Sequence, residues 1–251
     1  MSELAAWPVL AGRSLRLTVR NLDALLTAVL LPVMVLLLFV YLFGGAIRAG
    51  TPQYVTYAVP GVLVMCASYG ASMTAVMVAG DLKEGIVDRF RSMDVGGRML
   101  LSGHITASTM RNLFSVLMVF TVAFAIGFRP GAGPAAWAAA LAVLTAFIVA
   151  MAALSAAVGL LARTPEAASG FTFFVLFMPY PSSAFVPIDT MPDWLHGFAR
   201  NQPATPVIES VRGLLLDQPV GDRPWVALAW CAGLLLVAIA CSGPLFRRRT
   251  R

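Results

Sequence analysis

The chain has 251 residues, of which 59% are apolar and only 12% are charged. Charged residues usually make up about 25% of a soluble domain, so this composition excludes an ordinary soluble protein. The net charge of +6 is accompanied by no DNA- or RNA-binding motif. We therefore attribute it to membrane topology and to attraction for anionic lipid, and expect no nucleic-acid partner.

The N-terminal residues 3–22 have the pattern of an interfacial helix. In a helical projection Arg13, Arg16 and Arg20 lie within about 60° of one another, and leucine and tryptophan side chains gather opposite them. Such a helix rests on an anionic membrane surface with its apolar face toward the acyl chains. The alternative is that this stretch continues the first membrane span as a cytoplasmic extension.

Six apolar segments are long enough to span a bilayer, whose hydrocarbon core of about 30 Å requires roughly 20 apolar residues. They cover approximately residues 24–46, 55–80, 105–128, 135–161, 167–185 and 225–246. In the third segment Arg111 falls in the first turns, and we expect its side chain to snorkel to the headgroups. The sequence therefore predicts one all-α polytopic membrane domain over residues 1–251.

The basic residues predict how this domain is oriented. With six spans, thirteen of the eighteen Lys and Arg residues fall on the side that holds both termini. Cytoplasmic loops of membrane proteins carry such an excess of basic residues. We therefore expect a multi-pass protein of the cell membrane with both termini in the cytoplasm.

The densest cluster of charges lies between the second and third spans, in residues 81–98, which we call the elbow. Apolar residues at helical spacing form one stripe, and charged residues cover the other faces, which predicts a cytoplasmic helix. The stripe consists of Leu82, Ile86 and Phe90, and the charged positions are Asp81, Lys83, Glu84, Asp88, Arg89 and Arg91. Glu84 and Asp88 are like charges four residues apart, a pair that is easier to explain if a partner supplies cations. Gly85 permits close approach of another backbone. The alternative is a solvated loop whose arginines only fix the topology.

The fifth apolar segment is interrupted near its end. Four phenylalanines are followed by Pro179, Pro181 and Pro187, which remove backbone donors and break a helix. Inside a bilayer such a break is tolerated only where protein or a water-filled cavity satisfies the freed groups. A re-entrant turn that contains Phe185 is therefore predicted around residues 180–187. The phenylalanines are expected to pack between helices, with a ligand site as the alternative.

Two short helices are predicted beyond this turn. Asp193 begins the first, with Trp194 on the side that rests on the outer membrane interface, and the second covers about residues 207–216. Residues 180–216 would then form a re-entrant and extracytoplasmic region.

The sequence contains no recognised catalytic, metal-binding or cofactor-binding motif. The single lysine, Lys83, does not belong to a phosphate-binding GxxxxGK[ST] loop, so this route to ATP hydrolysis is absent. His104 and His196 are predicted at opposite membrane faces, and the three cysteines show no metal-ligand spacing. Carriers coupled to ions usually bury ionisable residues in their spans, where this chain has only Arg111. We therefore expect neither an enzyme nor a channel or secondary carrier.

The order of these features resembles the ABC-2 type permease family, and within it the membrane subunits of daunorubicin-resistance-type exporters of actinobacteria. The resemblance covers nearly the whole chain and is strongest in residues 182–212, SSAFVPIDTMPDWLHGFARNQPATPVIESVR. Where the family often has Ser-Gly before the phenylalanine, this chain has Ser182, Ser183 and Ala184.

The resemblance implies a permease subunit that moves a drug-like or lipid-like amphipathic substrate out of the cytoplasm or inner leaflet. Two permease copies, or two related permeases, would pair with two separately encoded ATPase subunits that bind ATP and Mg²⁺. The elbow would be the coupling helix. Its charged residues and Gly85 would contact the ATPase, and its apolar stripe would anchor it there. Spans one, two and five would line the route. An extracytoplasmic gate would include Pro179, Pro181, Phe185, Pro187 and Trp194. The alternative function is a membrane anchor or assembly subunit that recruits a soluble complex without moving cargo.

Overall fold

The computed structural model of the protein describes residues 22–47, 53–85 and 97–249, and every regular element in these ranges is a helix. The predicted interfacial helix at 3–22 lies almost entirely outside the described residues. In chain order the helices are α2 (Leu22–Leu37), the π-helix η1 (Leu38–Phe43), α3 (Tyr54–Lys83), α5 (Gly97–Ala125), α6 (Pro134–Leu161), α7 (Pro165–Phe177), the 3₁₀ helix η2 (Ile188–Thr190), α8 (Asp193–Asn201), α9 (Ala204–Leu215) and α10 (Arg223–Arg249).

Four helices in the described part of the chain are long and apolar enough to cross a membrane: Tyr54–Lys83, Met99–Ala125, Pro134–Leu161 and Arg223–Phe246. They correspond to the second, third, fourth and sixth predicted spans. The first and fifth correspond to shorter apolar helices, Ala28–Phe43 and Pro165–Phe177. The all-helical class with apolar spans is confirmed, whereas the count of six spans stays a prediction.

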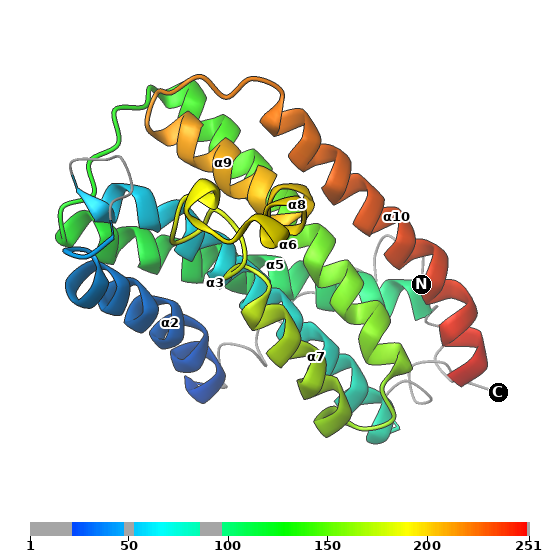
Figure 1. Ribbon diagram of the computed structural model, residues 1–251. Coiled ribbons are helices and arrows are strands. Elements are labelled where there is room, and N and C mark those ends of the chain that lie inside the picture. Colours follow the sequence, from blue (N-terminus) through cyan, green and yellow to red (C-terminus); the bar gives the residue numbers. More distant parts are fainter. Residues whose placement is uncertain (1–21, 48–52, 86–96, 250–251) are drawn as a thin grey trace.

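Helix α3 forms the centre of the bundle, and α2, α5, α6, α7 and α9 all pack against it (Figure 1). Its small and apolar residues are buried on nearly every side. Small residues allow close packing: a Cβ built on Gly159 of α6 would lie 2.6 Å from the carbonyl oxygen of Ala75 in α3. Close backbone approach of this kind is how helices gain van der Waals contact in lipid.

Helix α10 lies at the periphery, where it packs on α6 and α9 along one edge of the bundle (Figure 1). Large apolar side chains, among them Trp230, Leu236 and Ile239, are exposed along it. A helix that is apolar on its outer face requires an apolar environment, which a bilayer supplies.

The observed bounds correct the predicted second and third spans. Helix α3 continues through the first residues of the predicted elbow to Lys83, and α5 begins at Gly97, well before the predicted start at residue 105. Arg111 therefore lies in the middle of α5, and its side chain is 96% buried, so the prediction that it snorkels from a helix end is wrong.

The loops and short helices separate into two ends of the bundle. At one end, Leu82 of α3 packs with Leu101 of α5, Leu160 of α6 and Leu245 of α10. At the other end lie α8, α9 and the connection to α10 (Figure 1). The end of α3 and the end of α10 thus share one end, which we call the elbow end, and the short helices occupy the opposite one.

Candidate functional site

The described part of the elbow is the last turn of α3 and its cap. Asp81, Leu82 and Lys83 continue the helix, Glu84 follows it, and Gly85 adopts a left-handed backbone with φ +68°. Glycine adopts this conformation at low cost, and it commonly terminates a helix. The residues Ile86, Asp88, Arg89, Phe90 and Arg91, predicted to contact an ATPase, lie outside the described residues.

Two of the predicted contact residues face the chain's own helices. Asp81 Oδ2 lies 3.1 Å from His104 Nε2 of α5, and both side chains are largely buried. Leu82 packs in the apolar cluster at the elbow end, beside Val78 and Leu101. Leu82 is only partly buried there, so its role as an anchor for a partner stays a prediction, and His104 has a defined partner in the same chain.

The end of α3 also reaches α7. Lys83 Nζ lies 4.0 Å from Glu166 Oε1 in the first turn of α7, and both side chains are mostly exposed. The last turn of α3 is thereby joined to α5 by one polar contact and to α7 by another.

The predicted broken span is a turn segment, residues 178–187, that connects α7 to η2. It rests directly on the first half of α3: a Cβ built on Gly61 would lie 2.5 Å from the carbonyl oxygen of Ala184. The hydroxyl of Tyr54 donates a hydrogen bond of 2.7 Å to the carbonyl of Phe185. Within the segment, Ser182 Oγ donates to the carbonyl of Pro179. The backbone groups freed by the prolines thus find partners in protein.

Arg212 of α9 fastens this turn segment to α3. Its guanidinium donates to the carbonyl of Tyr57 at 3.0 Å and to that of Ser183 at 2.6 Å, and it lies 3.8 Å from the centroid of the Tyr57 ring. Burial lowers the pKa of the Arg212 guanidinium, opposed by the nearby Tyr57 and Glu209. Arg212 is the last residue of the motif at 182–212, but in the sequence it counted only as one of the five basic residues on the side opposite the termini.

Aromatic rings connect α7, the turn segment 178–187 and η1. Ring centroids are 5.7 Å apart for Phe177 and Tyr180, 5.3 Å for Tyr180 and Phe185, and 4.0 Å for Phe185 and Phe39. Aromatic pairs at such distances stabilise by about 0.5–1.5 kcal/mol beyond the area they bury. Phe185 is buried here, while Phe173, Phe174 and Phe177 of α7 expose half or more of their surface, contrary to the expectation that they pack between helices.

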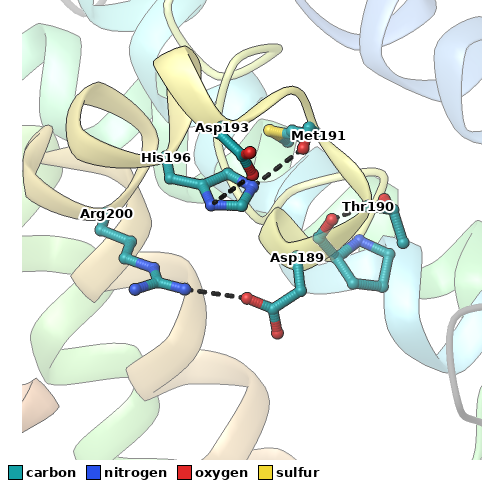
Figure 2. Close-up of polar contacts among 7 residues, drawn as sticks. Asp189, Thr190, Met191, Asp193, His196 and Arg200 are labelled. Atoms are coloured by element: carbon teal, nitrogen blue, oxygen red, sulfur yellow. Dashed lines mark hydrogen bonds and ion pairs between the residues drawn. The ribbon is translucent and has the colours of Figure 1, made fainter.

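Helix α8 is fastened to η2 by polar contacts (Figure 2). Arg200 Nη2 lies 2.8 Å from Asp189 Oδ1, and the imidazole of His196 lies 2.9 Å from the carbonyl of Met191. Trp194, a predicted gate residue, is 80% exposed. Pro187 caps η2, so it ends the turn segment and does not lie in a helix.

A buried polar layer lies between α3 and α5. Arg111 donates to the carbonyl of Gly70 at 3.1 Å, and a Cβ built on Gly70 would lie only 2.0 Å from Asn112 Oδ1. On these two helices, buried side-chain oxygens without a hydrogen-bond partner among the described residues belong to Ser68, Thr74, Asn112 and Ser115. Sequence reasoning missed this layer because serine and threonine in an apolar helix give no signal of their depth.

These arrangements hold the helices together. In the described ranges no group of three His, Cys, Asp or Glu side chains could hold a metal ion. At one end of the bundle, the polar last turn of α3 contacts α5 and α7. At the opposite end, the turn segment 178–187 is held against α3.

Comparison with known proteins decides the family. The family model for the ABC-2 type transporter matches residues 6–216, which is most of the chain. The chain belongs to the ABC-2 type transporter family. The elbow, the turn segment 178–187 and Arg212 all fall inside the matched region of this ABC-2 chain.

Two curated relatives are drug-resistance permeases of actinobacteria. The chain is 28% identical over 226 residues to the daunorubicin resistance ABC transporter permease protein DrrB1 of Streptomyces coeruleorubidus, covering 90% of this chain and 80% of the relative. It is 24% identical over 227 residues to the probable doxorubicin resistance ABC transporter permease protein DrrC of Mycobacterium tuberculosis, covering 90% and 81%. The predicted resemblance is confirmed: this ABC-2 chain is a transport membrane subunit related to efflux permeases.

Proposed function

We propose that this ABC-2 chain is the membrane subunit of an exporter driven by a separately encoded ATPase. The observation that carries the proposal is the end of α3, where exposed Lys83 and Glu84 project from a turn that is joined to both α5 and α7. A polar surface on such a turn is suited to receive force from a soluble partner. The charged residues Asp88, Arg89 and Arg91 would extend that surface.

The proposed partner binds ATP and Mg²⁺, because the chain has no phosphate-binding loop of its own. Two ATPase subunits and a second permease, identical or related, would complete the complex. The basic residues favour both termini and the elbow in the cytoplasm of a bacterial cell. The elbow and the end of α10 lie at the same end of the bundle, which supports this arrangement.

Force would pass from the elbow to the opposite end through packed helices. Movement of the last turn of α3 would displace α5 through Asp81 and His104, and α7 through the direct packing of α3 on α7. Helix α7 continues directly into the turn segment 178–187, which would open and close as an outer gate. Two distant sites can be coupled in this way when the packed helices between them switch between two discrete arrangements.

The cargo is proposed to be an amphipathic, drug-like or lipid-like molecule. Exposed apolar and aromatic side chains on α2, η1 and α7, such as Met34, Tyr41 and Phe174, would line the route with α3. The relatives are named for resistance to daunorubicin and to doxorubicin, which is consistent with such a surface.

The substitution Glu84→Arg tests the proposal in the complex co-purified with its ATPase. Glu84 is exposed, so the reversed charge should leave membrane insertion intact while it abolishes the ATPase activity that the permease stimulates. Asp193→Arg is the matched control, since Asp193 is fully exposed at the opposite end of the bundle. Unchanged turnover in Glu84→Arg, or equal loss in both variants, would count against the proposal.

A further inference from the structure

A cavity of about 430 Å³ opens between α9 and the start of α10, away from the elbow and from the aromatic rings. It is lined by Glu209, Arg212 and Gly213 of α9 and by residues 218–223 of the following connection. This volume lies within the range of small-molecule sites in proteins. None of the transport steps proposed above uses it.

The charges that line this cavity are only partly paired with each other. Arg223 Nε lies 3.2 Å from Glu209 Oε2, and this ion pair forms one wall. Arg212 uses Nε and Nη2 to bind the carbonyls of Tyr57 and Ser183, which leaves its Nη1 without a hydrogen-bond partner among the described residues. The two N–H groups on this nitrogen can therefore donate hydrogen bonds to an anion.

A carboxylate lies on the same cavity. Asp222 lines it, is exposed, and makes no ion pair within the described residues. Beyond the Glu209–Arg223 pair, the cavity therefore presents one cationic and one anionic group. A ligand that matches both must itself carry a negative and a positive charge.

The start of α10 gives the depth of the cavity in the membrane. Trp225, two residues after Arg223, is 76% exposed, and an exposed apolar stripe follows it along α10. Tryptophan prefers the headgroup level of a bilayer. The mouth of the cavity thus lies where lipid headgroups meet acyl chains.

We propose that this cavity binds a phosphate ester that carries a primary ammonium, as in the headgroup of phosphatidylethanolamine. The phosphate would accept hydrogen bonds from Nη1 of Arg212, and the ammonium would donate to Asp222. Phosphatidylcholine lacks N–H donors for Asp222, and phosphatidylglycerol lacks the positive charge. The acyl chains would lie along the exposed apolar face of α10.

The test is lipid binding by the purified full-length chain, measured by native mass spectrometry from micelles that contain equal amounts of the three lipids. We expect phosphatidylethanolamine to be retained about tenfold over phosphatidylcholine, the factor that one charge-assisted hydrogen bond supplies. Asp222→Asn should bring this ratio close to one. Gln218→Trp, which fills the cavity from the connection, should lower retention of phosphatidylethanolamine by a similar factor.

Asp217→Asn is the matched control, because it removes the same charge in the same connection outside the cavity, and asparagine tolerates the positive φ of residue 217. It should keep the tenfold preference. Equal retention of the three lipids by the unsubstituted chain, or an unchanged ratio in Asp222→Asn, would overturn the site. If free phosphoethanolamine bound as tightly as the lipid, the ligand would be the soluble compound and the proposal of a lipid would be overturned. Because the readout is binding, the result is independent of ATPase coupling.

Discussion

Among single residues, Arg212 joins the turn segment 178–187 to α3 through the carbonyls of Ser183 and Tyr57. Its replacement by methionine leaves the buried carbonyl of Ser183 without its donor. A buried polar group without a partner costs about 1–3 kcal/mol, and we expect the free energy of unfolding in detergent to fall by that amount. The measurement is denaturant or thermal unfolding of the purified chain.

Arg200→Met provides the control for this prediction. Arg200 also lies on a short outer helix, but its ion pair with Asp189 is mostly exposed. Exposed pairs contribute about 0–1 kcal/mol, so this variant should remain close to the parent protein. Equal destabilisation by the two substitutions would contradict the role given to Arg212.

Gly61 is required for the close approach of the turn segment 178–187 to α3. A methyl group at this position would lie 2.5 Å from the carbonyl oxygen and 2.7 Å from the Cα of Ala184, so backbone must shift. We expect Gly61→Ala to lower the free energy of unfolding by about 1–3 kcal/mol. Gly80→Ala in the same helix meets nothing within 4 Å and should be neutral or stabilising. The contact would be disproved if the two alanine variants unfolded alike.

Arg111 is a buried cation in the middle of α5. Its nearest acceptors are the carbonyl of Gly70 and the sulfur of Met77, and no carboxylate pairs with it among the described residues. Since desolvation of such a charge is costly, Arg111→Met should leave the unfolding free energy unchanged or raise it. A loss above about 3 kcal/mol, the size expected for a broken buried ion pair, would show that Arg111 has an acidic partner.

At the level of helices, the two contacts at the end of α3 should differ in strength. Asp81 and His104 are largely buried, whereas Lys83 and Glu166 are mostly exposed. A double-mutant cycle with Asp81→Asn and His104→Gln should give a coupling energy of about 0.5–3 kcal/mol. The matching cycle with Lys83→Gln and Glu166→Gln should give less than about 0.5 kcal/mol. The reverse order would mean that α7, and not α5, holds the end of α3.

The bounds of α6 could be predicted from local sequence to within one residue. Pro134 at its first position favours helix initiation, and the helix stops at Leu161, shortly before Pro165. Gly85 is a local signal for the end of α3, but the sequence does not reveal that the last turn packs on α5. That turn depends on Leu82 and Asp81, whose partners lie on α5 and become neighbours only after folding.

The same reason explains why the depth of Arg111 and the role of Arg212 were not predicted. The first turns of α5 are polar, so a hydropathy criterion places the start of the span too late. Arg212 meets Tyr57 across 155 residues of chain, a contact that spacing along the sequence does not reveal. The broken fifth segment, by contrast, was evident from its three closely spaced prolines, because each removes a backbone donor that a helix needs.

For the molecule as a whole, the account requires that the elbow end faces a nucleotide-hydrolysing partner and the short helices face away from it. A photo-crosslinking amino acid at position 84, compared with one at position 193, measures this in membranes that contain the intact complex. We predict a crosslink from position 84 to an ATPase subunit and none from position 193. Crosslinking of position 193 to the ATPase, or labelling of position 84 from outside intact cells, would contradict the account.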